Sequence, residues 1–170
     1  IFGHFQGVSS FDAWLAKNNP ASQPFPFPSD AAAQHHLIEE GWVWMLRFRD
    51  DLTSVGLVHE PSLSNPSSDS AQSIWDRVIH NYPSLAEIMS EVELVNPTQH
   101  GQPTLGWLRK VNRVWEFPLR NSGSRAPWCV LPNTLGVVDP LHSTGIAHGL
   151  WGTLQLADAI IQSTSLDKLK

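Results

Sequence analysis

The residue types and spacing that point most directly to chemistry lie near the end of the chain, at residues 139–146, which read Asp-Pro-Leu-His-Ser-Thr-Gly-Ile. A strand, a glycine-containing turn and a helix are predicted around this segment. Free backbone amides at a helix start can face an anion, a carbonyl or a phosphate. Ser143 and Thr144 are suitable cap residues for that helix. The segment therefore predicts an amide-rich binding site.

A purely structural interpretation of the same residues is also open. Asp139 and Pro140 form an ordinary helix start, with Asp as the cap and Pro in the first turn. Gly145, Gly149 and Gly152 leave one helical face without side chains, against which a flat cofactor or a neighbouring strand can pack. The opposite, apolar stripe is predicted to be buried against a sheet. Its members are Ile146, Leu150, Leu154, Ala157 and Ile161.

Residues 131–146, Leu-Pro-Asn-Thr-Leu-Gly-Val-Val-Asp-Pro-Leu-His-Ser-Thr-Gly-Ile, resemble the second flavin-binding motif of flavoprotein monooxygenases. They are most similar to flavin-dependent halogenases, including tryptophan halogenases, whose version reads Asp-Pro-Leu-x-Ser-Thr-Gly-Ile. In that family the amides at the Thr-Gly step lie beside the isoalloxazine ring and hold the halide, which implies this role for Thr144 and Gly145. The residues implied to contact FAD are Asn133, Asp139, Pro140, Ser143, Thr144, Gly145 and Ile146.

Two positions in this region depart from the family. Asn133 stands where these proteins usually have an Asp that bonds the ribityl chain, and His142 stands where tryptophan halogenases carry a Glu near the reacting centre. Imidazole titrates close to neutral pH, so His142 is a candidate catalytic acid or base. A histidine bonded locally at a helix start is the alternative.

A second resemblance lies at residues 41–46, Gly-Trp-Val-Trp-Met-Leu, which are similar to the halogenase segment Trp-x-Trp-x-Ile-Pro. The two motifs occur in the order and rough spacing of the family. Leu46 replaces the Ile and Arg47 the Pro. Trp42 and Trp44 fall on one face of a predicted strand. They either wall an aromatic substrate pocket or form core against the helices of residues 70–92.

The resemblance implies an enzyme in which reduced FAD and oxygen form a flavin hydroperoxide that oxidises halide or an aromatic substrate. A small aromatic molecule, halide and a flavin reductase are then the expected partners. Two alternatives stay open: a flavin monooxygenase that hydroxylates without halogenating, and a non-catalytic ligand-binding module on the flavoprotein scaffold.

Composition excludes several other classes. The net charge is −5 and the Lys and Arg residues are scattered, so nucleic acid is not an expected partner. The apolar stretches are too short to cross a bilayer, and the single cysteine, Cys129, excludes an internal disulfide framework. The histidines lack metal-ligand spacing with Cys or carboxylate residues, so no metal is expected. A reducing, cytoplasmic location fits these features.

The elements that must position the two motifs follow from periodicity. Alternation predicts a strand over residues 1–8 and a three-stranded antiparallel meander over residues 35–60, with its second turn at Asp50 and Asp51. Helical spacing predicts helices over residues 9–17, capped by Ser10, and over residues 70–81. A further helix is predicted from Pro83 to about Val95. The remaining predictions are an extended loop over 19–28, a polar loop over 96–103, strands within 104–118 and at 128–131, and a final helix to about Ser163.

The predicted fold class is α+β. Residues 1–118 form a substrate-side antiparallel sheet with helices, and residues 119–170 form the closing strand-turn-helix of an FAD-binding fold like that of p-hydroxybenzoate hydroxylase. Flavoproteins of this kind bind the ADP half of FAD on a Gly-x-Gly-x-x-Gly turn. The chain has no such pattern. The N-terminal dinucleotide-binding half is therefore expected to be missing, and the chain to be a fragment that is inactive alone.

Overall fold

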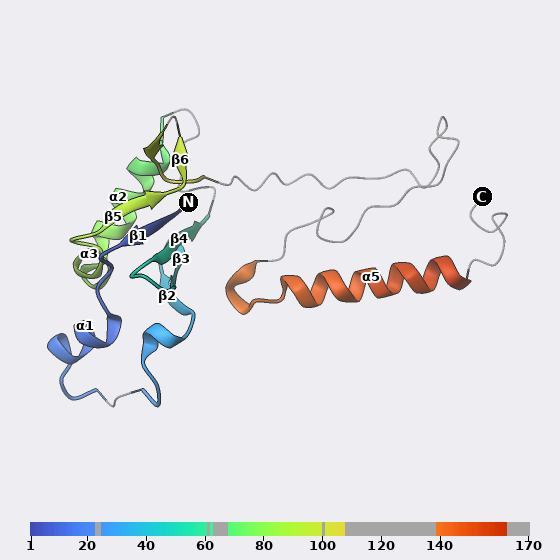
Figure 1. Ribbon diagram of the computed structural model, residues 1–170, viewed down its shortest axis with the longest axis horizontal. Helices are drawn as coiled ribbons and strands as arrows, with labels where there is room; N and C mark the ends of the chain where they lie inside the picture. The colour runs from blue at the N-terminus through green and yellow to red at the C-terminus, as the bar shows by residue number, and fades with distance from the viewer. Residues whose placement is uncertain (23–24, 61, 63–67, 100, 108–138, 163–170) are drawn as a thin grey trace. The chain divides into compact units, whose positions relative to one another are not determined.

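The computed structural model describes residues 1–22, 25–60, 62, 68–99, 101–107 and 139–162, and it divides the chain into two units, Ile1–Arg109 and Lys110–Lys170 (Figure 1). The first unit holds a sheet and its helices, and the second holds the long helix near the end of the chain. The predicted boundary between residues 118 and 119 lies outside the described residues and stays a prediction, as does the strand predicted at 128–131. Of the strands predicted within 104–118, residues 104–107 are described, and they show a single bridge from Gly106 to Phe2 rather than a strand.

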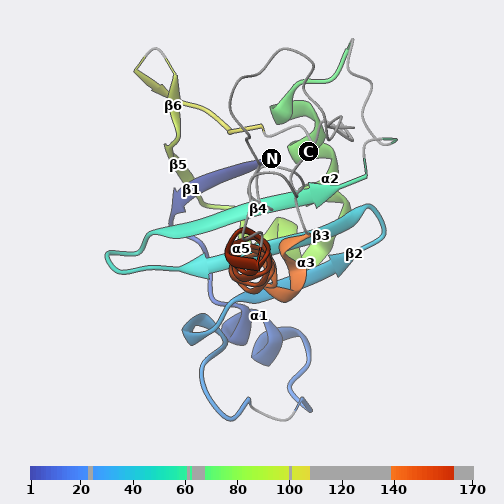
Figure 2. The same cartoon turned by 90° about the vertical axis from the view of Figure 1, so that its right-hand side faces the viewer.

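The first unit contains a five-stranded sheet in the order β2-β3-β4-β1-β5, in which each neighbouring pair is antiparallel (Figure 2). The predicted meander is confirmed and supplies three of the five strands, β2, β3 and β4. Its second turn uses Asp50 and Asp51 at φ of 61° and 57°, a left-handed conformation that aspartate tolerates better than most residues. The strands are β1 Phe2–Gln6, β2 Gln34–Ile38, β3 Gly41–Arg47, β4 Thr53–His59 and β5 Glu93–Asn96.

Two of the predicted helices are confirmed as α1, Phe11–Asn18, and α2, Ala71–Asn81. Ser70 begins α2 with a capping box, in which its hydroxyl oxygen accepts from the Ser73 amide at 3.0 Å and the Ser73 hydroxyl oxygen accepts from the Ser70 amide at 2.9 Å. Ser10 stands at the N-cap of α1 as predicted, but its side chain makes no capping bond. A short 3-10 helix, η1 (Ser29–Ala31), follows the proline-containing loop.

The third predicted helix is wrong in its second half. Pro83 does begin a helix, α3, but α3 ends at Ile88, and Glu93–Asn96 forms strand β5 beside β1. A short apolar run fits a helix stripe and a strand equally well, and the unpaired edge of β1 selects the strand. The chain then makes a small hairpin where a polar loop was predicted, with β6 Thr98–Gln99 and β7 Gln102–Pro103.

The core of the first unit lies on one face of the sheet, between the strands and helices α2 and α3 (Figures 1 and 2). The Phe5 ring stacks on Trp75 of α2, with 5.5 Å between ring centroids. Val43 and Met45 of β3 point into this core, because alternate residues of a strand face opposite sides. The remaining core side chains include Val55, Leu57, Ile74, Val78, Ile79, Leu85 and Ile88.

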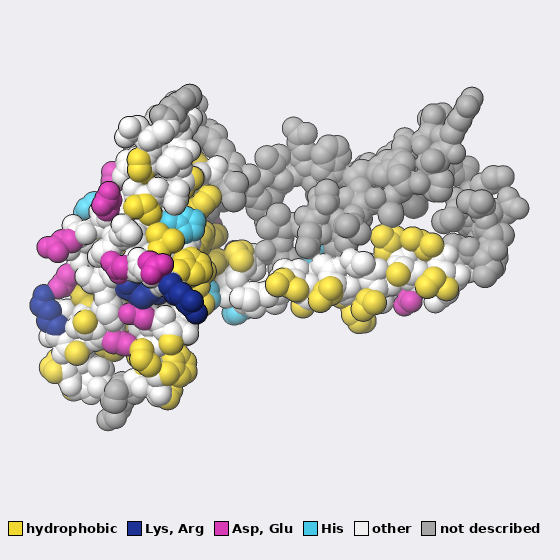
Figure 3. Space-filling view, viewed as in Figure 1, with side chains coloured by type: hydrophobic (Ala, Val, Ile, Leu, Met, Phe, Trp, Pro, Cys, Tyr) yellow, Lys and Arg dark blue, Asp and Glu magenta, His cyan; other side chains and the backbone are white. Residues whose placement is uncertain are grey.

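The second unit contains a 3-10 turn, η3 (Pro140–His142), followed by helix α5 (Gly145–Gln162). The predicted final helix is confirmed, except that it begins at Gly145 rather than at Pro140. Figure 3 shows hydrophobic side chains along α5, and the described residues of the second unit cover none of them. Burial of the apolar stripe against a sheet stays a prediction. No described helix is long and apolar enough to cross a membrane.

Candidate functional site

The helix start at residues 143–146 presents unpaired backbone amides. The first bond of α5 runs from the His148 amide to the Thr144 carbonyl at 2.9 Å. The amides of Thr144, Gly145 and Ile146 precede it and have no acceptor within the helix. No other described residue supplies a hydrogen-bond acceptor to these amides. At the positive end of an 18-residue helix, such donors favour an anion or the oxygen-bearing edge of a ring.

The alternative of an ordinary helix start, with Asp139 as the cap and Pro140 in the first turn, is confirmed for the 3-10 turn η3 but not for α5. The Asp139 side chain accepts from the Leu141 amide at 3.0 Å, so it caps the 3-10 turn and not α5. Between the two, Ser143 adopts a left-handed conformation with φ of 55°. A Cβ built on Gly145 would meet no atom within 4 Å. Among the described residues, nothing covers the amide end of α5 at Gly145.

His142 is exposed in η3, and the part of the chain that the structure describes gives its ring no hydrogen bond. The alternative of a locally bonded helix-start histidine stays open. A role as acid or base stays a prediction. Asn133 lies outside the described residues, and its contact with the cofactor stays a prediction too.

Trp42 and Trp44 lie on the face of the sheet opposite to α2 and α3. Val43 and Met45, which alternate with them along β3, belong to the core cluster that includes Ile74 of α2. The interpretation of the two tryptophans as core against the helices of residues 70–92 is therefore wrong. The reason is that both faces of β3 are apolar, and the helices cover the face with the smaller side chains.

The two tryptophans form an aromatic group with residues of the neighbouring strands. Their rings are 5.8 Å apart, and the His35 ring of β2 meets Trp42 edge-on at 5.3 Å. Trp44 Nε1 donates to Ser54 Oγ of β4 at 3.3 Å. Trp42 Nε1 is buried and has no hydrogen-bond partner among the described residues. Sequence reasoning missed His35 and Ser54, although the cross-strand register of the predicted meander was a signal for both.

Arg47, one of the two residues that depart from the halogenase segment, connects four parts of the first unit. Its guanidinium donates to the Val8 carbonyl at 2.6 Å and to Asp51 Oδ1 at 3.2 Å, and its Nε lies 3.3 Å from Asp30 Oδ2. Asp51 in turn accepts from the Gly7 amide at 3.1 Å. Arg47 thus joins the end of β3 to the β1–α1 junction, η1 and the β3–β4 turn. Sequence analysis gave no signal of this role.

No group of three or more potential metal ligands occurs among the described residues. The expectation that the chain binds no metal stays a prediction.

The sequence of the chain is similar to those of two halogenases. It is 26% identical to tetracycline 7-halogenase of Kitasatospora aureofaciens over 155 residues, which are 87% of this chain and 25% of that protein. It is 27% identical to monodechloroaminopyrrolnitrin halogenase PrnC of Pseudomonas fluorescens over 120 residues, 67% of this chain and 19% of that protein. No protein-family model matches the chain. The chain thus spans about a quarter or less of the length of these curated relatives.

Solved halogenase structures share the fold. The crystal structure of halogenase PltM matches 95% of this chain and 31% of its own, with a TM-score of 0.69 and 21% identity. The myxobacterial chondrochloren halogenase CndH, described as a variant of FAD-dependent halogenases, matches 99% of this chain and 35% of its own, with a TM-score of 0.62 and 18% identity. The mixed α/β architecture with an antiparallel sheet is thereby confirmed. The chain is halogenase-like in sequence and fold, as its two motifs predicted. This similarity covers about a fifth to a third of the length of those halogenases.

Proposed function

We propose that this chain is part of an FAD-dependent halogenase and that residues 139–146 hold the flavin edge and the halide. The observation that carries the proposal is the set of unpaired amides at Thr144, Gly145 and Ile146, on a helix start where Gly145 has open space around it. A PltM structure with FAD bound is among the fold relatives. When bound, FAD supplies the oxygen-dependent oxidation, and the chain supplies binding and orientation.

The amides at the helix start fit both ligands that we assign to them. A halide carries a full negative charge, and N–H groups at a helix N-terminus stabilise it through hydrogen bonds and through the helix dipole. The flavin ring is flat and carries carbonyl oxygens, so it needs donors without side chains in front of them. Gly145 provides that access because it has no Cβ.

We further propose that Trp42 and Trp44 line the pocket of an aromatic substrate. Both rings lie on the face of the sheet that α2 and α3 leave free. Trp42 is buried beside Trp44, and the partly exposed Trp44 ring offers stacking surface to a planar ligand. His142 is the candidate that holds or moves a proton. The flavin reductase partner, the upstream dinucleotide-binding half and the cytoplasmic location remain predictions.

The proposal is tested on the full-length protein with FAD, NADH, a flavin reductase, chloride or bromide, and phenol, indole and pyrrole as aromatic probes. A halogenated product whose yield depends on halide supports the proposal. A product that is only hydroxylated favours the monooxygenase. Binding of the aromatic probes without any turnover favours the non-catalytic module.

The amide site itself is tested with two substitutions at one residue. Gly145→Pro removes the amide at the first helical position, where proline fits a helix well, whereas Gly145→Ala keeps the amide. Hydrogen bonds to a charged group are worth about 1.5–3 kcal/mol. The KM for halide is therefore expected to rise about tenfold or more in Gly145→Pro and to change little in Gly145→Ala. Equal KM values in the two variants would exclude the Gly145 amide from the halide site.

The tryptophan pocket is tested through the aromatic probe. Trp44→Leu is expected to raise the KM of that probe while the KM for halide stays unchanged, because Trp44 is assigned to the organic substrate alone. Trp14→Phe is the matched control, since Trp14 lies on α1 and donates to Glu87 rather than joining the Trp42 group. An unchanged probe KM in Trp44→Leu would remove the pocket from the proposal but not the amide site.

A further inference from the structure

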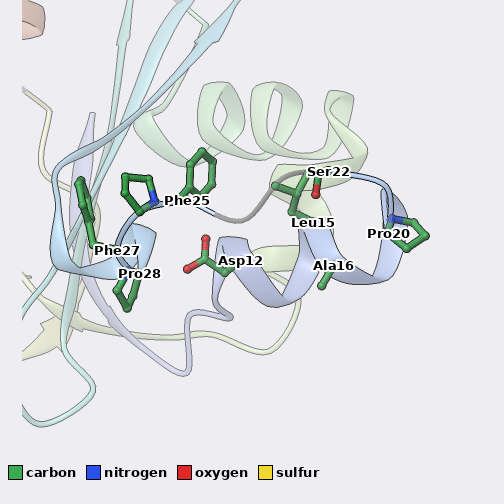
Figure 4. A pocket seen from close by; sticks show the side chains of 9 residues that line it. Asp12, Leu15, Ala16, Pro20, Ser22, Phe25, Phe27 and Pro28 are labelled. Atoms are coloured by element: carbon green, nitrogen blue, oxygen red, sulfur yellow. The ribbon is translucent and has the colours of Figure 1, made fainter.

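A cavity of about 580 Å³ lies between helix α1 and the proline-containing residues 25–28 (Figure 4). Small-molecule pockets typically have about 300–1,000 Å³. The cavity uses none of the residues assigned above to flavin, halide or aromatic substrate. It is therefore a separate feature that the proposed function does not explain.

The walls of the cavity are apolar and partly aromatic. Leu15 and Ala16 line it from α1, and Phe25, Phe27 and Pro28 line it from the loop (Figure 4). The side chains of Phe25 and Phe27 are 49% and 55% exposed. Such half-exposed rings offer their faces to a ligand, and aromatic faces attract cations as well as apolar groups.

Among the described lining residues, Asp12 alone carries a formal charge. Its Oδ2 accepts from the Ser29 amide at 2.8 Å, which fixes the carboxylate against η1. Its Oδ1 is buried and has no hydrogen-bond partner among the described residues. Figure 4 shows the carboxylate pointing from α1 toward the side of the cavity that carries Phe25 and Phe27. Asp12 therefore places a negative charge in the wall of the cavity, on the side of its aromatic residues.

We propose that this cavity binds an organic ammonium ion, with the ammonium group at the Asp12 carboxylate and its apolar body between Phe25 and Phe27. The Asp12 carboxylate, as the charged group of the described lining, selects the positive charge by ion pairing. The two rings and the apolar wall of α1 accept the rest of the molecule. A neutral aromatic compound gains only the apolar contacts, and an organic anion is repelled by Asp12.

The test is isothermal titration calorimetry of the full-length protein with three probes of similar shape. These are 2-phenylethylammonium, neutral 2-phenylethanol and anionic phenylacetate. The ammonium probe is expected to bind about tenfold more tightly than the alcohol, as a partly desolvated ion pair with cation–π contacts allows. Phenylacetate is expected to bind most weakly. Equal affinities for the ammonium and the alcohol, or no saturable binding of the ammonium, would overturn the proposal.

Variants locate the site. Asp12→Asn keeps the shape of the side chain but removes its charge. It is expected to lower the affinity for the ammonium probe to that for 2-phenylethanol and to leave the affinity for 2-phenylethanol unchanged. Asp76→Asn is the matched control, because Asp76 is an exposed carboxylate on α2 outside the cavity. Trp44→Leu must leave ammonium binding intact, which separates this cavity from the aromatic substrate pocket.

A second variant keeps the test decisive if Asp12→Asn disturbs the fold through its bond to Ser29. Phe25→Ala removes a half-exposed ring that is not part of the core cluster. It is expected to lower the affinities for the ammonium probe and for 2-phenylethanol by similar factors. Wild-type affinity for the ammonium in Phe25→Ala would overturn the proposed binding mode.

Discussion

The indole of Trp44 lies against Gly56, its cross-strand partner on β4, so closely that a Cβ built on Gly56 would come within 2.0 Å of Trp44 Cζ2. Glycine therefore gives the indole room to lie across the backbone of the neighbouring strand. The hydrogen bond from Trp44 Nε1 to Ser54 holds the ring in the same position. The geometry of the proposed aromatic pocket thus depends on a residue that has no side chain.

The first prediction concerns that contact. Gly56→Ala forces the Trp44 indole out of its position, and overpacking of this kind costs about 1–3 kcal/mol of unfolding free energy. Urea denaturation measures the loss, and tryptophan fluorescence of the folded state should change with it. Gly145→Ala adds a methyl group to open space and should cause no loss of stability. Equal stability of both variants would mean that Trp44 does not need the space at Gly56.

The second prediction concerns Arg47. Arg47→Met keeps the length of the aliphatic chain but removes the bond to the Val8 carbonyl and the ion pairs with Asp30 and Asp51. Asp51 is exposed, so its pair is worth little, and most of the loss should come from the two less exposed partners. Chemical denaturation should show about 1–3 kcal/mol of destabilisation. The exposed Arg49→Met is the control, and a loss of the same size there would contradict the role of Arg47.

The third prediction concerns pH. Burial lowers the pKa of His36, and the neighbouring His35 lowers it further. The unfolded chain therefore binds a proton at His36 more readily than the folded chain does. The stability that His36 contributes is complete above its ordinary pKa, near 6.5, and is lost as the pH falls from there through the lower folded pKa.

His36→Leu removes this contribution. Denaturation midpoints measured from about pH 7.5 to 5 should fall less steeply in the variant than in the wild type. His80→Gln, on the exposed side of α2, should keep the steep fall. Parallel curves for His36→Leu and the wild type would show that another group is responsible.

The fourth prediction uses Tyr82, the single tyrosine of the chain. Its hydroxyl donates to Glu40 Oε2 at 2.5 Å and accepts from the Glu39 amide at 2.9 Å. The hydrogen bond to Glu40 raises the pKa of Tyr82 above its ordinary value near 10. In Glu40→Gln the neutral amide replaces the carboxylate, so the pKa of Tyr82 should fall, as measured by phenolate absorbance on the 170-residue chain. Glu60→Gln should leave that titration unchanged, and an unchanged curve in Glu40→Gln would contradict the contact.

Local sequence patterns were sufficient to predict the meander and helix α2. The alternation over residues 42–48 and the turn at Asp50 and Asp51 are short-range signals, and the capping box of Ser70 and Ser73 lies within one helical turn. The strand β5 was not predictable in this way. Its choice of strand over helix depends on the free edge of β1, which lies far away in the sequence.

The halogenase-like motif was likewise visible in the sequence, but parts of the site were not. Asp139 was predicted to cap the long helix and instead caps η3, because the left-handed Ser143 separates the two. The partners of Arg47 come from three different segments, and no spacing rule connects them.

The sequence by itself determined that a helix follows Asp139 and that the amides at its start are unpaired, because amides at a helix start lack an acceptor in any sequence context. It also determined that Trp42 and Trp44 share one face of a strand, because side chains alternate along β3. Only the tertiary structure decided which face is the core. Both faces of β3 are apolar, and the packing of α2 and α3 onto Val43 and Met45 leaves the tryptophan face for another role.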